Sequence, residues 1–116
     1  MHSPARILVV EDDNLLRFVI CEVLRDGDLE VVEVANADAA LLYLKTKDSI
    51  DLVFTDVNMP GSIDGLELAQ AVNENFPEVK VLVTSGNTPA ASTGPNPFIP
   101  KPYVVYDVLD KIRAAL

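Results

Sequence analysis

The segment from Leu52 to Gly61, LVFTDVNMPG, most constrains what this chain can fold into. An apolar run rich in valine and phenylalanine ends on Asp56, and a Pro-Gly turn signal follows it closely. Such a run is typical of a buried strand in a parallel sheet. In doubly wound sheets the ligand crevice lies outside the carboxyl ends of the strands, where Asp56 would stand. An aspartate that only begins a turn is the alternative interpretation of this segment taken alone.

The composition limits the class of protein. A chain of 116 residues is long enough for one domain with a real core, so we expect residues 1–116 to form a single domain. No apolar stretch approaches the ~20 residues that cross a bilayer, so no membrane is expected as a partner. The net charge of -9 argues against a nucleic-acid partner, which requires clustered basic residues. The chain has a single cysteine, Cys21, which suits a reducing compartment, so we expect the protein in the cytoplasm. We expect Cys21 itself to be a small core residue.

Two kinds of apolar pattern alternate along the chain. Strand-like segments are expected at Arg6–Val10, Leu29–Val34, Asp51–Thr55, Val79–Thr84 and Phe98–Ile99. Helical segments are expected between Asp13 or Asn14 and Gly27, from the Asn36 cap to Lys47, at Leu66–Phe76 and at Val104–Leu116. The buried face of the first helix should carry Leu15, Leu16, Val19, Ile20, Val23 and Leu24. This alternation predicts an α/β fold with a doubly wound, five-stranded parallel sheet of the flavodoxin-like order 2-1-3-4-5.

Four of the predicted strands end on a group that can take part in chemistry. Glu11 and Asp12 follow the first strand, Asp56 the third, Ser85 the fourth and Lys101 the fifth. In the order 2-1-3-4-5 the first and third strands are neighbours, so the three carboxylates should share one pocket. Clustered carboxylates repel one another unless protons or cations offset their charge, and Mg²⁺ is a divalent cation that prefers oxygen ligands.

Such a pocket fits a phosphoryl group that arrives in line at Asp56. The metal and Lys101 would stabilise the charge on the equatorial oxygens, and the Ser85 hydroxyl would hold one of them. The product would be an acyl phosphate.

Over essentially its whole length the chain resembles the receiver domain of bacterial two-component response regulators. Residues 7–13, ILVVEDD, resemble the strand and acidic pair of that family. Residues 56–61, DVNMPG, resemble its phospho-acceptor motif, and residues 64–65, DG, the turn after it. Residues 83–86, VTSG, and 99–102, IPKP, match its Thr/Ser-small and Lys-Pro steps. One departure is the loop at residues 61–63, which looks one residue longer than is usual in the family.

The resemblance implies a role for each residue of the predicted pocket. Asp56 would be the phospho-acceptor, and the bond between Lys101 and its following proline would be cis. The Mg²⁺ ion would be held directly by Asp12, through water by Glu11, and by the backbone carbonyl of Asn58.

The resemblance also implies how the domain would switch and how long it would stay phosphorylated. Ser85 and Phe98 fall on the switch positions of the family, with Thr84 turned into the core. Asn58 and Asn87 fall on positions that tune autodephosphorylation.

The segment between the fourth and fifth strands departs from the family pattern. Receivers usually have a full helix there, but residues 86–102 hold five prolines at positions 89, 95, 97, 100 and 102. We therefore expect this helix to be replaced by a proline-rich, mobile loop from Asn87 to Asn96, which phosphorylation would order.

By the same resemblance, the partner would be a sensor histidine kinase or a histidine phosphotransferase. The chain would be a monomer or a weak dimer, and it would not be an enzyme. A small aspartyl-nucleophile phosphohydrolase is one alternative, but it would need an acid two residues after the nucleophile, where Asn58 stands. An unphosphorylated interaction module of the same fold is another, and it would be expected to have lost Asp56, Lys101 or a member of the acidic pair.

Overall fold

One parallel sheet organises the chain. The computed structural model describes residues 4–46, 48–59, 61–86 and 96–116. The strands are β1 (Arg6–Val10), β2 (Glu30–Val34), β3 (Leu52–Asp56), β4 (Lys80–Ser85) and β5 (Phe98–Pro100). They pair in the order β2-β1-β3-β4-β5, and every neighbouring pair is parallel. The predicted doubly wound, flavodoxin-like sheet is therefore confirmed.

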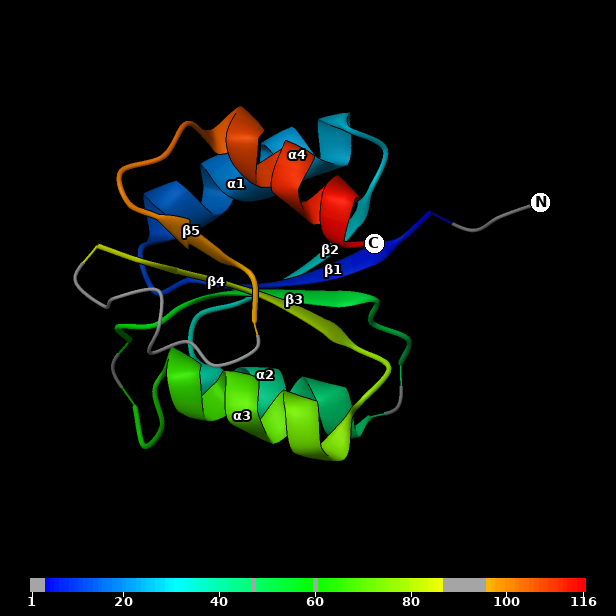
Figure 1. Cartoon of the computed structure of the whole chain (residues 1–116), viewed down its shortest axis with the longest axis vertical. Helices are drawn as coiled ribbons and strands as arrows, with labels where there is room; N and C mark the ends of the chain where they lie inside the picture. Colours follow the sequence, from blue (N-terminus) through cyan, green and yellow to red (C-terminus); the bar gives the residue numbers. More distant parts are fainter. Residues whose placement is uncertain (1–3, 47, 60, 87–95) are drawn as a thin grey trace.

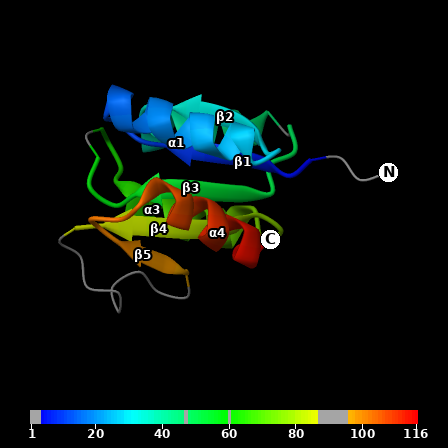
Figure 2. The ribbon, with the colours of Figure 1, turned by 90° about the horizontal axis from the view of Figure 1, so that it is seen from above.

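Helices cover the two faces of the sheet in separate layers (Figure 1). The helices α1 (Asn14–Asp26) and α4 (Val105–Ala115) lie on one face, and α2 (Ala37–Lys45) and α3 (Gly65–Asn75) lie on the other. The view from above shows α1 lying over β1 and β2, with α4 over the other half of the sheet (Figure 2). This arrangement follows from the right-handed crossovers that join parallel strands.

The core has two halves, one on each face of the sheet. Because β3 is central, all five of its residues are buried, and its side chains serve both halves. The half under α1 and α4 contains Ile7, Val9, Ile20, Cys21, Leu24, Phe54, Leu82 and Ile112 among its members. The half under α2 and α3 contains Leu8, Val10, Ala40, Leu44, Val53, Leu68, Val72 and Val83 among its members. Cys21 is thus a buried core residue, as predicted.

Side-chain caps set the start of three helices. The carboxylate of Asp13 accepts a hydrogen bond from the Leu16 amide at 2.9 Å, so Asp13 caps α1 as predicted. The Asn36 side chain caps α2 in the same way. At α3, Asp64 and Glu67 form a reciprocal capping box, which satisfies two amides that the helix itself cannot pair.

Several predicted details of the elements were wrong. Leu15 and Val19 were expected on the buried face of α1, but both are exposed, with Leu15 at 73%. The third strand is shifted by one residue, so Asp56 is its last residue and does not follow it. The second helix ends at Lys45, before the predicted Lys47, which lies outside the described residues.

Two other expectations have different outcomes. The bond between Lys101 and Pro102 is cis, as the resemblance implied. Residues 87–95 lie outside the described residues, so the predicted loop between β4 and β5 stays a prediction.

Among the helices of the described ranges, none has the length and apolar character needed to cross a membrane.

Candidate functional site

The acidic side chains predicted to meet at the carboxyl edge of the sheet do meet there. β1 and β3 are adjacent, with Val10 opposite Thr55, so the residues that come next lie side by side. Each of Glu11, Asp12 and Asp56 places a carboxylate oxygen within 4.8 Å of the others. Glu11 is 2% exposed and Asp56 5% exposed, whereas Asp12 is exposed to solvent. The cluster therefore has a buried floor and one open side.

Lys101 adds a positive charge to this cluster. It follows β5, and its ammonium group donates a short hydrogen bond to the Oδ2 atom of Asp56. Burial by itself would lower the pKa of Lys101, but the hydrogen bond and the charge of Asp56 outweigh it and raise that pKa above its ordinary value. With all three acids ionised, the cluster and Lys101 sum to two negative charges, which one divalent cation would neutralise.

Glu11 shows the cost of gathering carboxylates in a buried place. Burial raises the pKa of Glu11 to about 7, and the charge of Asp56 adds to the effect. A hydrogen bond from the Asp13 amide to Glu11 Oε2, at 3.0 Å, acts in the opposite direction. Glu11 is therefore no solvated strand end but a buried carboxylate of the cluster.

The loop after β3 lines the other side of the site. The Asn58 amide donates to Asp56 Oδ1 at 3.0 Å, so both oxygens of the Asp56 carboxylate are engaged. The side-chain amide of Asn58 donates to Ser85 Oγ at 3.3 Å, which joins the ends of β3 and β4. Ser85 is buried beside the site, while the Thr84 hydroxyl, buried within the described structure, has no hydrogen-bond partner there.

The cluster fits a magnesium ion by its chemistry. Carboxylate oxygens are the ligands that Mg²⁺ prefers, and it commonly uses one or two of them together with water or phosphate oxygens. Asp12, on the open side, leaves room for such additional ligands. The two buried members, Glu11 and Asp56, form a floor of oxygen atoms beneath that open side.

Phe98 and Asn87 are the remaining predicted site residues. Phe98, in β5, is partly buried and packs against the core half that contains Val83. No contact in the described structure tests its switch role, which stays a prediction. Asn87, the second tuning position, lies outside the described residues.

An additional contact that the sequence did not predict holds the loop after β3. Asp38, in the first turn of α2, accepts hydrogen bonds from the Ser62 amide at 3.2 Å and the Ser62 hydroxyl at 2.5 Å. Gly61 has a φ of 128°, and a Cβ atom there would lie 2.9 Å from Asp38 Oδ2. The only sequence signal was the longer loop at residues 61–63, which does not identify the partner that anchors it.

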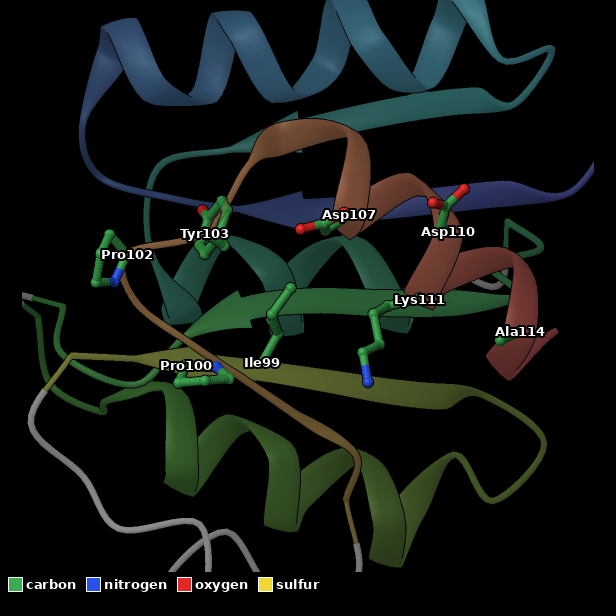
Figure 3. A pocket seen from close by; sticks show the side chains of 8 residues that line it. All are labelled: Ile99, Pro100, Pro102, Tyr103, Asp107, Asp110, Lys111 and Ala114. Atoms are coloured by element: carbon green, nitrogen blue, oxygen red, sulfur yellow. The ribbon is translucent and has the colours of Figure 1, made fainter.

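A separate hollow lies between β5 and α4 (Figure 3). Its volume is about 500 Å³. Its walls are Ile99, Pro100, Pro102, Tyr103, Asp107, Asp110, Lys111 and Ala114. Among these described residues there is no member of the carboxylate cluster, so the hollow is distinct from the predicted pocket.

The match to a known family agrees with this geometry. Residues 7–113 match the family model of the response regulator receiver domain. The chemotaxis protein CheY of Listeria monocytogenes is 31% identical over 95% of this chain and 97% of its own length. The response regulator protein FleR of Pseudomonas aeruginosa is 33% identical over 93% of this chain but only 24% of its own length.

A solved structure extends the likeness to three dimensions. The response regulator TrrA of Thermotoga maritima, in complex with Mg²⁺-BeF, has 26% sequence identity and a TM-score of 0.84, covering 97% of this chain and 99% of that one.

The chain belongs to the response regulator receiver domain family. Receiver domains of response regulators act in two-component signalling, and they bind Mg²⁺ at an acidic site. The chain spans about a fifth to a quarter of the length of three larger response regulators that it matches, at 19%, 24% and 25%.

Proposed function

We propose that this chain is a phospho-accepting signalling domain in which Asp56 takes a phosphoryl group from a phosphohistidine. The observation that carries the proposal is the meeting of Glu11, Asp12 and Asp56 around the Lys101 ammonium at the carboxyl edge of the sheet. Such a set of charges suits the dianionic phosphoryl group and the metal that accompanies it. Family membership supports the same role.

In the proposed reaction, a carboxylate oxygen of Asp56 attacks phosphorus in line with the bond to the donor nitrogen. The new O–P bond forms as the N–P bond breaks, and the histidine of the donor leaves with the bonding electron pair. Lys101 already contacts Asp56 Oδ2 and would follow the charge onto the phosphoryl oxygens. The Ser85 hydroxyl would donate to one of these oxygens, while its oxygen accepts from the Asn58 side-chain amide as it does now.

Magnesium would supply charge neutralisation in this site when bound. Asp12, Glu11 through water, Asp56 and the backbone carbonyl of Asn58 are its proposed ligands. The remaining assignments are Ser85 and Phe98 as the switch pair and Asn58 and Asn87 as tuning positions. We place the chemistry in the cytoplasm, because the lone thiol of Cys21 suits a reducing compartment.

Incubation with acetyl phosphate and Mg²⁺, followed by intact-protein mass spectrometry, tests the proposal. We expect the mass of one phosphoryl group to be added, and we expect no addition when EDTA removes the metal. Rapid release of inorganic phosphate without an accumulating adduct would indicate the phosphohydrolase instead. No adduct and no release would indicate an unphosphorylated interaction module.

The donor protein has a suitable surface beside the site. Leu15, in the first turn of α1, is 73% exposed, and this turn follows the acidic pair at the carboxyl edge. A hollow of about 420 Å³ lies at the same edge. Its walls include Leu16, which follows Leu15 in the chain, and Lys101. A partner that brings a phosphohistidine to Asp56 must cover this edge, so we propose that it packs on Leu15.

The substitution Leu15→Ser tests this docking surface. Transfer from a phosphorylated histidine phosphotransfer domain that serves the wild-type chain should slow about tenfold, because an exposed apolar anchor contributes 1 to 2 kcal/mol, roughly, to association. Phosphorylation by acetyl phosphate, which needs no docking, should not change. Leu42→Ser is the matched control, since Leu42 is 68% exposed on α2, on the other face of the sheet. Equal slowing in both variants would refute the surface.

A further inference from the structure

Arg17 joins three elements behind the acidic cluster. It lies on α1, and its side chain is only 17% exposed. Its Nη1 atom donates to the carbonyl oxygen of Glu11 at 2.7 Å, and its Nη2 atom donates to Asn14 Oδ1 at 2.8 Å. Its Nε atom donates to Glu33 Oε1 at 3.3 Å, on β2. One guanidinium group thus links the end of β1, the start of α1 and the neighbouring strand.

The hydrogen bond from Arg17 to the Glu11 carbonyl oxygen holds the backbone between the two acids of the proposed metal site. The carbonyl of Glu11 belongs to the peptide unit that joins Glu11 to Asp12, the two acids of the proposed metal site. A peptide unit is planar, so fixing its oxygen fixes the direction of the Asp12 amide and Cα as well. On the other side, the Glu11 amide donates to the Val34 carbonyl at 3.2 Å. The backbone is thereby held both before and after the Glu11 side chain.

Among the described residues, the Asp12 side chain has a hydrogen bond with the Glu11 side chain, and no group outside the acidic pair is seen to anchor it. Its side chain is exposed, whereas Glu11 has the bond from the Asp13 amide. The direction in which Asp12 presents its carboxylate therefore depends on the backbone that precedes it. A rotation of the Glu11–Asp12 peptide would separate the two carboxylates that now lie within 4.8 Å.

We propose that Arg17 is a positioning residue for the metal site, which orients the Glu11–Asp12 peptide so that both carboxylates face one cation. This inference rests on the proposed function, because it assumes that the cluster binds Mg²⁺. Arg17 itself is not proposed as a ligand of the metal or of the phosphoryl group. Residues that orient metal ligands from behind commonly change metal affinity about 10- to 100-fold when they are replaced.

Arg25 provides a matched control on the same helix. It also pairs with Glu33, at 3.3 Å, and it donates to a backbone carbonyl of β2, that of Val31, at 3.4 Å. Its hydrogen bonds in the described structure do not reach the Glu11 carbonyl. Arg17 and Arg25 therefore share the tie between α1 and β2, and they differ in the contact with the acidic pair.

The test compares Arg17→Met with Arg25→Met by calorimetric titration with MgCl₂. Methionine keeps an apolar stem but removes the charge and the hydrogen bonds. We expect the Mg²⁺ affinity to fall about tenfold or more in Arg17→Met and to change less than about twofold in Arg25→Met. Urea unfolding in EDTA should show a similar loss of stability in the two variants, because both lose an ion pair with Glu33.

Arg17→Lys distinguishes an effect of the positive charge from an effect of the orientation of the Glu11–Asp12 peptide. It also replaces Arg17→Met in the test if the methionine variant does not fold. Lysine keeps the positive charge but lacks the planar fork that holds three partners at once. We expect its Mg²⁺ affinity to fall well below that of the wild type. Wild-type affinity in Arg17→Lys, or equal losses in Arg17→Met and Arg25→Met, would overturn the positioning role.

These outcomes are distinguishable from failure of the proposed function. If the wild-type chain binds Mg²⁺ and accepts a phosphoryl group while the Arg17 variants bind the metal normally, only the role of Arg17 is refuted. If the wild-type chain binds no Mg²⁺ at all, both proposals fail together.

Discussion

Replacing Gly65 with alanine is expected to cost about 3 kcal/mol or more of folding free energy. Gly65 is the first residue of α3, and its amide donates to the Val57 carbonyl at 2.9 Å. A Cβ atom at this position would lie 1.8 Å from the carbonyl oxygen of Asp56 and 2.8 Å from Val57 Cα. Both obstacles are backbone atoms, of the last residue of β3 and of the buried residue after it, so relief requires that the helix or this backbone move.

The gain in helix propensity cannot offset this clash. Alanine is better than glycine inside a helix by about 1 kcal/mol, and less at the first position. Urea unfolding in EDTA measures the difference. Gly86→Ala is the matched control, because among the described residues a Cβ there would meet Lys101 Cβ alone, at an ordinary 3.7 Å. We expect this control to stay within about 0.5 kcal/mol of the wild type.

A Gly65→Ala protein as stable as the Gly86→Ala protein would contradict the position of α3 against β3. The effect has a functional side, because the Asp56 carbonyl belongs to the residue that would carry the phosphoryl group. A small residue at this position lets α3 begin close to the phospho-acceptor.

Replacing Asp12 with asparagine is expected to weaken Mg²⁺ binding at least about tenfold and to slow phosphorylation by acetyl phosphate strongly. Two unit charges about 4 Å apart attract each other by about 4 kcal/mol at an effective dielectric constant of about 20, and a divalent cation is attracted more strongly. In EDTA the same substitution should leave the protein equally stable or more stable, because it removes repulsion from Glu11 and Asp56. The stabilisation that Mg²⁺ adds should therefore shrink in this variant, while the stability in EDTA does not fall.

Asp13→Asn is the control for this prediction. It removes the same charge from the next residue, and asparagine caps a helix about as well as aspartate. Asp13 lies outside the group of three carboxylates that meet. We expect its Mg²⁺ affinity to stay within about threefold of the wild type, since the charge that is lost is exposed to solvent, which screens it. Equal losses in Asp12→Asn and Asp13→Asn would remove Asp12 from the metal site.

Much of the site could be predicted because parallel topology converts sequence order into spatial order. Once the first and third strands are neighbours, Glu11 and Asp56 must end at the same edge, and no side-chain detail is needed. The same rule brought Ser85 and Lys101 to that edge, where the Lys101 amide donates to the Ser85 carbonyl at 3.0 Å. The sequence pattern was sufficient for these positions because each is either the last residue of a strand or the residue directly after it.

Other features could not be predicted, because they depend on contacts between distant segments. Apolar residues in α1 extend over more of its circumference than the sheet covers, so periodicity alone did not separate exposed Leu15 from buried Ile20. The role of Arg17 needs Glu11 and Glu33 from two strands at once. The tie between Asp38 and Ser62 likewise joins the start of α2 to a loop 24 residues later.

Locating the phosphoryl group on the chain shows directly whether Asp56 is the phospho-acceptor. The protein is phosphorylated with acetyl phosphate and Mg²⁺ and then reduced with borohydride, which converts an aspartyl phosphate into homoserine. Peptide mass spectrometry should find homoserine at position 56, and the Asp56→Asn protein should take up no phosphoryl group. A reduced residue at another position, or an Asp56→Asn protein phosphorylated as fast as the wild type, would contradict the account.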